Sequence, residues 1–569
     1  MAFETAISEV LESISFVKAL FLGQIYDYKP MKKKWMAPKR TMLLSNAVLF
    51  LLYLSCQNHD LPYTDRDVFR YNEARNITSL DPAFARNPQN NWAAQQLFNG
   101  LVQLNDSLEV IPEIAKSWTI DSTGTVYRFY LRKEVFFHAS PAFKEGIPRA
   151  VTAADFVYSF DRLLDPELAS PGGWVLQRVA GYRAIDSHTL EIKLKNPFPA
   201  FLGLLSMRYC AVVPEEGIAY YGSRFRSNPI GTGPFVFKYW EEGVKLILRK
   251  NTTYFEKDDQ QQPLPYLEAI AIQFIPDIQS EFMLFLQGKL DFMNSLDNSY
   301  KDELLTPDGL LRPKYKDKII MQQGPYLNTE YIGFYMEADH PIMKNPALRE
   351  ALSIGFDRNQ MIDYLRNNIG FTAYKGFIPK GLPGHTDQDW VRYDPQAARE
   401  RIRTFEADNG PLPTLKIATD ANYLDLCEYL QREWEKIGVK LQIDVMPTAT
   451  LRQAKSSGKL ELFRASWIAD YPDAENYLGL YYSKNFAPFG PNYTHFKNET
   501  YDSLFEKTFL IKSPKQRYAL YKKLDSIVMT HHPIINLFYD KAVRFLQPNV
   551  VGMTMNPINT LNLKRVKKE

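Results

Sequence analysis

Residues 415–446 read "LKIATDANYLDLCEYLQREWEKIGVKLQIDVM", and this stretch decides the fold class. Residues 415–419 are typical of a short strand, residues 425–439 carry apolar side chains at helical spacing, and residues 440–446 read as a second strand. A strand, a helix and a strand in this order form a βαβ unit with parallel strands. The sequence therefore predicts an α/β fold.

The same alternation of strand-like and helix-like segments continues on both sides of this unit. Residues 152–165, "TAADFVYSFDRLLD", begin with a threonine suited to an N-cap and continue with apolar residues at helical spacing. Residues 189–198, "TLEIKLKNPF", alternate as a half-buried strand does. With 569 residues and 45% hydrophobic content, the chain can bury several cores, and its length suggests roughly two to four domains.

The N-terminal residues 1–56 carry a different pattern from the rest. From Met31 the chain reads "MKKKWMAPKRTMLLSNAVLFLLYLSC", a basic start followed by an apolar run from Met42 to Leu54. The run is too short for a comfortable bilayer span and has the length of a signal-peptide core. The Ser-Cys ending at Cys56 resembles a bacterial lipoprotein box, in which the cysteine is lipidated. We therefore expect residues 1–56 to be a misassigned start plus a lipoprotein signal peptide, with an uncleaved anchor or a buried helix as the alternative.

Charge argues against a nucleic-acid partner. Residues 1–55 hold seven Lys and Arg and four Asp and Glu, which accounts for the formal net charge of +3. The protein without this segment is nearly neutral, and no cluster of Lys and Arg alternates with aromatic residues. Because non-specific binding to nucleic acid needs such a positive field, we expect no nucleic-acid partner.

Motifs for metals, cofactors and catalysis are absent from the sequence. The one adjacent pair, His531-His532, cannot place both rings on one face of a helix or strand, and no HExxH or CxxC occurs. "GTGPF" at residues 231–235 lacks the Lys-Ser/Thr ending of a phosphate loop, and G-x-S-x-G is missing. We expect no metal and no cofactor. We also expect Cys210 and Cys427 to be buried and unbridged, with a disulfide as the alternative.

From about Phe69 to its end, the chain resembles the periplasmic solute-binding proteins of peptide ABC transporters, the oligopeptide- and dipeptide-binding family. The segments that carry the resemblance, in the family's order, are "SLDPAF" (79–84), "LFNGLVQLN" (97–105), "VIPEIAKSW" (110–118), "VTAADFVYSF" (151–160), "PIGTGPFVF" (229–237), "NPALREALSIGFDR" (345–358) and "SWIADYPDAENYL" (466–478).

The resemblance implies a periplasmic-binding-protein-like fold with two lobes, a hinge between them and an extra domain inserted in the first lobe. The implied divisions are a first lobe of residues 66–99, 215–324 and 531–569, an inserted domain of residues 100–214 and a second lobe of residues 325–530. It further implies a monomer, lipid-anchored in the periplasm or cell envelope, that captures peptides between its lobes. The partners would be the permease and ATPase subunits of an ABC importer.

Three acids follow a tryptophan in "FRASWIADYPDAENY", residues 463–477. Pro472 breaks the strand-like run, so Asp473 suits an N-cap and Glu475 suits the first turn of the next helix. Asp470 has no such local duty. It lies at the exit of a strand, where α/β sheets place ligand contacts, and the resemblance implies that it receives the α-ammonium group of a bound peptide. A loop or salt-bridge role for Asp470 is the alternative.

Other residues are candidate contacts for an extended ligand. The backbone of Ser466, Trp467 and Ile468 can pair with a peptide as an added strand, and Trp467 can line a side-chain pocket or belong to the core. Arg464 can meet a peptide carboxylate as a bidentate fork, or pair with Glu461. The contacts that the resemblance adds are Ile77, Thr78 and Ser79 through their backbone, and the aromatic ring of Tyr539, for which a core position is the alternative.

Two other functions compete with peptide binding. The same fold also serves non-peptide solutes, namely nickel chelates, haem or oligosaccharides, and a requirement for a free α-ammonium group separates these from peptides. A glycosidase-type hydrolase would need a carboxylate pair, for which Asp470 with Asp473 or Glu475 is the candidate. Because helix capping already explains two of these three acids, we expect the protein not to be an enzyme.

Overall fold

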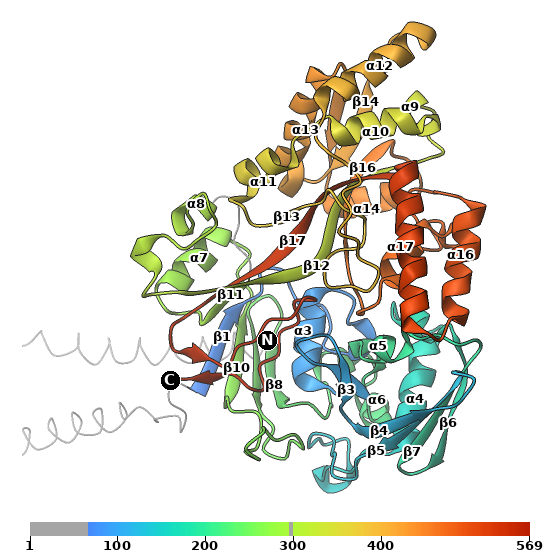
Figure 1. Ribbon diagram of the computed structural model, residues 1–569. Coiled ribbons are helices and arrows are strands. Elements are labelled where there is room, and N and C mark those ends of the chain that lie inside the picture. Colours follow the sequence, from blue (N-terminus) through green and yellow to red (C-terminus); the bar gives the residue numbers. More distant parts are fainter. Residues whose placement is uncertain (1–66, 295–299) are drawn as a thin grey trace, which may run out of the picture. The chain divides into compact units, whose positions relative to one another are not determined.

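An eleven-stranded mixed sheet forms the framework of the computed structural model, which describes residues 67–294 and 300–569 (Figure 1). The strand order is β15-β14-β16-β12-β17-β11-β1-β10-β9-β8, and β13 pairs with β17. The bounds are β1 (Val68–Asn72), β8 (Phe235–Glu241), β9 (Lys245–Lys250), β10 (Ala269–Gln273), β11 (Phe292–Asn294), β12 (Ile320–Phe334), β13 (Phe371–Thr372), β14 (Leu415–Thr419), β15 (Leu441–Val445), β16 (Leu462–Ile468) and β17 (Ile534–Leu546).

Two long strands, β12 and β17, join the two halves of this sheet. β17 pairs with β12 along most of its length and with β11 at residues 544–546, whereas β12 also pairs with β16 at residues 328–334. The register of β12 against β17 shifts between Pro325 and Thr329, and such an irregularity bends and twists a strand. The fold therefore has two lobes that share one sheet, with the irregularity where the chain crosses between them.

The predicted βαβ unit lies at one end of the sheet and confirms the α/β class. β14 and β15 are parallel, and α13 (Leu424–Lys436) connects them. Trp434 and Leu430 of α13 are fully buried in a core shared with the neighbouring helices. The other helices of this lobe are α9 (Pro341–Lys344), α10 (Pro346–Ile354), α11 (Arg358–Arg366), α12 (Pro395–Asn409), α14 (Thr448–Ser456), α15 (Glu475–Leu478), α16 (Glu499–Leu510) and α17 (Pro514–His531).

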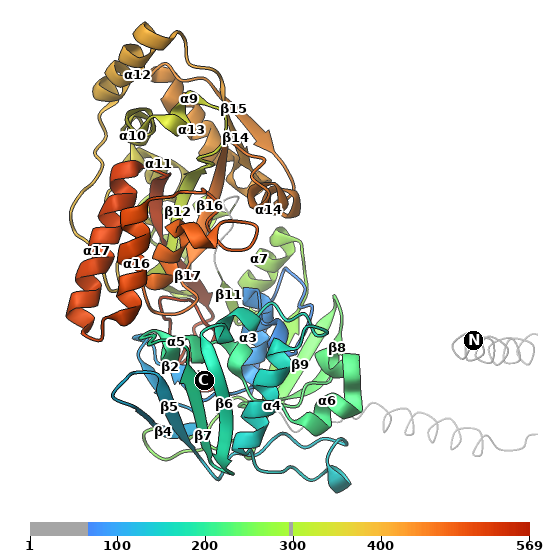
Figure 2. The ribbon, with the colours of Figure 1, turned by 90° about the vertical axis from the view of Figure 1, so that its right-hand side faces the viewer.

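A second, four-stranded antiparallel sheet lies within residues 115–194, and Figure 2 shows α4 beside it. The strand order is β4-β5-β7-β6, with β4 (Ala115–Ile120), β5 (Val126–Leu131), β6 (Val179–Asp186) and β7 (Thr189–Leu194). Helix α4 (Ala153–Leu164) begins with a capping box between Thr152 and Asp155, which confirms the predicted helix start. The sheet falls inside the predicted insertion, residues 100–214, and the division of the chain into domains stays a prediction.

The remaining strands and α-helices of the described residues complete the fold. They are β2 (Val102–Leu104), β3 (Val110–Pro112), β18 (Val550–Val551), β19 (Lys567–Lys568), α3 (Pro88–Leu97), α5 (Phe201–Leu205), α6 (Glu215–Tyr221), α7 (Ile278–Leu286) and α8 (Lys301–Leu304).

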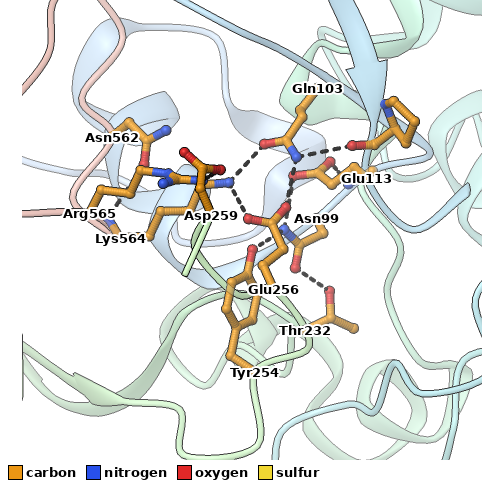
Figure 3. A network of polar contacts seen from close by, with 12 residues as sticks. Asn99, Gln103, Glu113, Thr232, Tyr254, Glu256, Asp259, Asn562, Lys564 and Arg565 are labelled. Carbon is orange, nitrogen blue, oxygen red and sulfur yellow. Dashed lines mark hydrogen bonds and ion pairs between the residues drawn. The ribbon is translucent and has the colours of Figure 1, made fainter. Parts of the chain in front are cut away.

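A polar network fixes the C-terminal segment to the first lobe (Figure 3). Lys564 Nζ donates to Glu256 Oε2 at 2.5 Å and to Gln103 Oε1 at 2.9 Å, while Gln103 Nε2 donates to Glu256 Oε1 at 2.7 Å. Nearby, Asn99 Nδ2 donates to Glu113 Oε1 at 2.9 Å. Lys564 and Glu256 are mostly buried. Together with Gln103 they join three segments that lie far apart in the sequence.

Both cysteines of the described chain are buried and free, which confirms the expectation for Cys210 and Cys427. In residues 67–294 and 300–569, helices with the length and apolar content of a membrane span are absent. Residues 1–56, including Cys56, lie outside the described residues, so the predicted signal peptide and lipid attachment stay predictions.

Candidate ligand-binding cleft

A cavity of about 1920 Å³ lies where several strands of the large sheet end, and we call it the main cavity. Its wall includes residues 72–75 after β1, residues 421–426 after β14 and residues 467–471 at the end of β16. β1 is parallel to β10, and β14 is parallel to both β15 and β16. The main cavity therefore lies at the carboxyl ends of these strands, where open α/β sheets bind ligands.

Asp470 lines the main cavity directly after β16, and its side chain is open to the cavity. Its carboxylate accepts a hydrogen bond from Asn476 Nδ2 at 3.1 Å. The surrounding protein desolvates the Asp470 carboxyl and so raises its pKa above its ordinary value, partly offset by the hydrogen bond from Asn476. Within residues 67–294 and 300–569, no basic side chain forms an ion pair with Asp470. The carboxylate thus faces the cavity and lacks a positive partner in the part of the chain that the structure describes.

The two neighbouring acids do have partners. Asp473 Oδ1 accepts from the Glu475 backbone N–H at 3.0 Å and from Tyr521 Oη at 2.7 Å, and Asp473 Oδ2 lies 3.4 Å from Arg517. Glu475 accepts from Tyr471 Oη and lies in the first turn of α15, as expected. The N-cap of α15 is Ala474, so the prediction of Asp473 at this position was wrong by one residue. Asp473 still caps the helix: from the position before the N-cap, its carboxylate accepts from the backbone N–H of Glu475, the first helical residue.

The end of β16 offers both side chains and backbone to the main cavity. Trp467 and Ile468 line it, whereas Ser466 does not. Trp467 Nε1 donates to Asn476 Oδ1 at 3.0 Å, so Asn476 holds both this indole and the Asp470 carboxylate. On one edge, residues 466–468 pair with β12; on the other edge, β14 pairs only with residues 462–463 among the described residues. That second edge is free to pair with an added strand.

Arg464 lies behind the wall of the main cavity rather than in it. It forms a buried ion pair with Glu330 of β12, and its guanidinium carbon lies 3.1 Å from the centre of the Tyr423 ring, which lines the cavity. The structure thus gives Arg464 the partner Glu330, and the alternative of a pair with Glu461 was wrong. Contact between Arg464 and a ligand carboxylate stays a prediction.

The first-lobe candidates lie apart from Asp470. Ile77 is buried, and Thr78 and Ser79 line a second hollow of about 1580 Å³. The Thr78 backbone N–H donates to Asn90 Oδ1 at 3.1 Å, so this group already has a partner. Tyr539 is buried, and its hydroxyl donates to the Gly376 carbonyl at 2.5 Å. None of these four residues lines the main cavity, and their ligand contacts stay predictions.

Sequence reasoning missed the first-lobe wall of the main cavity, formed by residues 72–75 and 85–89. Residues 72–75 follow strand β1 as Asp470 follows β16, so the strand-exit argument would have found them. Residues 85–89 precede or open α3, whose N-cap is Asn87, and only the packed structure brings them to the cavity. Glu73 is the most perturbed acid of this wall: burial, with a further contribution from Glu281, raises its pKa to about 7.

The chain matches a known protein family and several known proteins. Residues 109–488 match the family model described as bacterial extracellular solute-binding proteins, family 5 middle. The chain is 26% identical over 511 residues to the periplasmic oligopeptide-binding protein OppA of Escherichia coli, covering 85% of this chain and 89% of OppA. It is also 26% identical over 562 residues to heme-binding protein A of Haemophilus influenzae, covering 91% and 97%.

A solved structure gives the same fold. The periplasmic binding protein DppA from Helicobacter pylori, in complex with the peptide STSA, superposes with a TM-score of 0.76 at 23% identity and covers 88% of this chain and 98% of its own. These similar proteins are named as binding proteins, in agreement with the expectation of a non-enzyme. The chain belongs to the family 5 bacterial extracellular solute-binding proteins.

Proposed function

We propose that this solute-binding protein captures peptides for an ABC importer and holds their α-ammonium group at Asp470. The observation that carries the proposal is the Asp470 carboxylate, which opens into the main cavity and has Asn476 but no positive partner among the described residues. A peptide ammonium would supply both the missing charge and hydrogen-bond donors. Charge-assisted hydrogen bonds of this kind contribute about 1.5–3 kcal/mol, and exclusion of water strengthens them.

The end of β16 supports an extended ligand. The unpaired edge of residues 466–468 can form main-chain hydrogen bonds with a peptide laid alongside it, which gives affinity without reading the peptide's sequence. Trp467 is held by Asn476 and faces the cavity, so its ring can cover a ligand side chain. OppA and the DppA complex with STSA, named above, are peptide-binding proteins of the same fold.

Haem is the rival ligand, because heme-binding protein A is as similar to the chain as OppA is. The main cavity, at about 1920 Å³, is larger than many small-molecule sites and has room for either ligand. Its described lining contains neither histidine nor cysteine, two of the side chains that commonly hold haem iron. Methionine and tyrosine, which hold haem iron in some proteins, do line the cavity, so the preference for peptides rests on the Asp470 carboxylate rather than on this absence.

Ligand exchange on the purified protein tests the proposed function. The protein is unfolded and refolded to remove carried ligand, and calorimetric titrations then compare free tripeptides, their N-acetylated forms and haem. We expect tight binding of the free tripeptides alone. Equal binding of free and acetylated tripeptides, or a preference for haem, would contradict the proposal. Native mass spectrometry of the untreated protein identifies the ligand carried from the cell.

We further propose that a lipid on Cys56 anchors the protein to a membrane of the cell envelope, where it delivers peptide to the importer. The proposal is motivated by the basic start, the short apolar run and the Ser-Cys ending in residues 31–56. In fractionated cells, Cys56→Ser should move the protein from the membrane to the soluble fraction. Unchanged membrane association of this variant would sink the lipid anchor while leaving the peptide proposal intact.

A further inference from the structure

Tyr209 combines burial with a hydroxyl that is unused inside the protein. It belongs to the short 3-10 helix η5 (Arg208–Cys210), lines the main cavity and is 8% exposed. Among the described residues, its hydroxyl has no hydrogen-bond partner, whereas the buried Tyr471 and Tyr477 of the same region donate to Glu475 and to the Leu327 carbonyl. The hydroxyl oxygen is not among the buried polar atoms that lack a partner, so it is accessible from the main cavity, where a ligand can accept its hydrogen bond.

Packing fixes the Tyr209 ring. A methyl group added at Gly172 would lie 2.2 Å from the ring carbon Cδ1, so the ring fills the space that the glycine leaves. Tyr209 also shares a hydrophobic core with Tyr471, the residue directly after Asp470. Helix α5, which precedes η5, approaches the same loop, since a methyl group at Gly203 would lie 3.4 Å from Pro472. The ring therefore belongs to the wall that carries Asp470.

The hydroxyl lies in the fields of two opposite charges. Burial, with a smaller contribution from Asp470, raises the pKa of Tyr209 to about 12, while Arg86 opposes this shift. The hydroxyl thus keeps its proton at neutral pH and can donate a hydrogen bond. Arg86 is exposed, lines the main cavity and has no ion-pair partner within residues 67–294 and 300–569. A ligand near Tyr209 therefore lies in a cavity whose wall also carries the negative Asp470 and the positive Arg86.

This arrangement matches the first residue of a peptide, in which a positive ammonium is followed by a carbonyl oxygen. We propose that Tyr209 determines specificity for peptides by donating a hydrogen bond to the carbonyl oxygen of the ligand's first residue, next to the ammonium held by Asp470. Arg86 favours the same placement, because its charge attracts the carbonyl oxygen and repels the ammonium. The proposal deepens the peptide function and depends on it.

A donor at this place separates peptides from simple amines. An amine without the neighbouring carbonyl can satisfy Asp470 but gives the Tyr209 hydroxyl on the cavity wall no acceptor. Sites built to pair with a ligand group reject analogues that lack it far more strongly than apolar pockets reject a change in size. Selection at Tyr209 thus acts on the peptide backbone and leaves the side chains free to vary.

Tyr209→Phe tests the hydroxyl while keeping the ring that packs on Gly172. Calorimetry with a free tripeptide should give roughly five- to thirtyfold weaker binding, as expected for a buried carbonyl that loses its donor. The matched control is Tyr220→Phe, because Tyr220 is 54% exposed and lies outside the main cavity. It should bind as the natural protein does. Binding by Tyr209→Phe within twofold of this control would overturn the proposal.

A chemical change in the ligand identifies the group that the hydroxyl contacts. A tripeptide whose first carbonyl is a thiocarbonyl keeps its shape but offers a weak acceptor. It should bind the natural protein several-fold more weakly than the oxygen form and lose little further affinity in Tyr209→Phe. If the thiocarbonyl weakens binding by the same factor in Tyr209→Phe as in the natural protein, the two changes act independently, and the assignment of the hydroxyl to this carbonyl is overturned. The assignment is also overturned if Tyr209→Phe loses less affinity for the N-acetylated tripeptide than for the free one, because the hydroxyl would then contact the ammonium.

The outcomes separate this inference from the function beneath it. If free tripeptides fail to bind the natural protein, the peptide function itself is wrong. If they bind and Tyr209→Phe binds equally well, only the role of Tyr209 is wrong. Should Tyr209→Phe not fold, the natural protein decides alone: a thiocarbonyl in the first peptide unit must weaken binding more than one in the second, and equal losses would contradict the proposal.

Discussion

Strand β16 carries charged side chains in two regions that differ in what surrounds them. In its middle, Arg464 is buried against Glu330 of the neighbouring strand β12, and Asn328 adds a hydrogen bond to Glu330 at 3.0 Å. At its end, Asp470 opens into the main cavity with Asn476 as its side-chain partner. Strand β16 thus carries a charge that the fold neutralises, and the loop after it, six residues later, carries one that has no positive partner among the described residues.

The difference separates stability from binding. Removing one member of a buried ion pair leaves the other charged and unpaired, which costs far more than losing an exposed pair. Removing Asp470 leaves no opposite charge behind. Because burial raises its pKa, the ionised form is unfavourable in the empty protein, and a ligand cation relieves that cost. We therefore expect changes in the middle of β16 to affect folding and changes at its end to affect affinity.

The largest effect is expected for Glu330→Ala, which strands the buried Arg464 guanidinium. The free energy of unfolding should fall by about 3–5 kcal/mol in urea denaturation. The control is Glu303→Ala, because Glu303 pairs with Lys314 where both side chains are about half exposed. It should cost less than about 1 kcal/mol. Equal losses in the two variants would remove the distinction between the middle of β16 and an ordinary surface pair.

The next effect concerns affinity. Asp470→Ala should weaken binding of a free tripeptide by roughly thirtyfold to several thousandfold, because the buried ammonium loses its partner. The free energy of unfolding without ligand should stay unchanged or rise. Asp339→Ala, which alters a fully exposed acid, is the control and should leave affinity unchanged in calorimetry. If Asp470→Ala lowers the free energy of unfolding but leaves affinity unchanged, Asp470 serves stability rather than binding.

Features of the fold and the site that depend on neighbouring residues were predictable from sequence, whereas contacts between residues far apart in the sequence were not. The βαβ unit depends on local patterns, so residues 415–446 were found from sequence; the position of Asp470 at a strand exit was found in the same way, and its role in binding stays a prediction. The partner of Arg464 lies 134 residues away, and only the order of strands in the sheet brings Glu330 beside it. The ligand contacts of Thr78 and Ser79 stay predictions; the structure places both residues at the second hollow, where Thr78 is bonded to Asn90.

The affinity for the ligand should fall at low pH because Asp470 becomes protonated. The ligand binds the ionised Asp470 carboxylate, so affinity should fall as pH falls through its raised pKa, by about tenfold per pH unit below it. In the empty protein the sign is opposite. The folded state binds the Asp470 proton more tightly than the unfolded state, so this residue's destabilising contribution disappears as pH falls. Titrations of the natural protein and Asp470→Asn at several pH values isolate the contribution, and identical pH profiles would contradict it.

The smallest effect concerns Trp467, which donates to Asn476, the residue that holds the Asp470 carboxylate. Trp467→Phe removes the indole N–H that donates to Asn476 at 3.0 Å but keeps an aromatic ring on the cavity wall. Affinity for a free tripeptide should fall roughly two- to tenfold, the loss typical of one neutral hydrogen bond. Calorimetry decides, with Trp174→Phe, another tryptophan of the cavity wall, as the matched variant. A loss as large as that of Asp470→Ala would place the main ligand contact on Trp467.

The central claim is that Asp470 receives the ligand's ammonium, and a four-way calorimetric cycle tests it most directly. The natural protein and Asp470→Ala are each titrated with a free tripeptide and with its N-acetylated form. We predict that acetylation weakens binding to the natural protein about as much as Asp470→Ala weakens binding of the free tripeptide, and that acetylation costs little more in the variant. If free and acetylated tripeptides bind the natural protein equally well, Asp470 does not hold an ammonium and the account is contradicted.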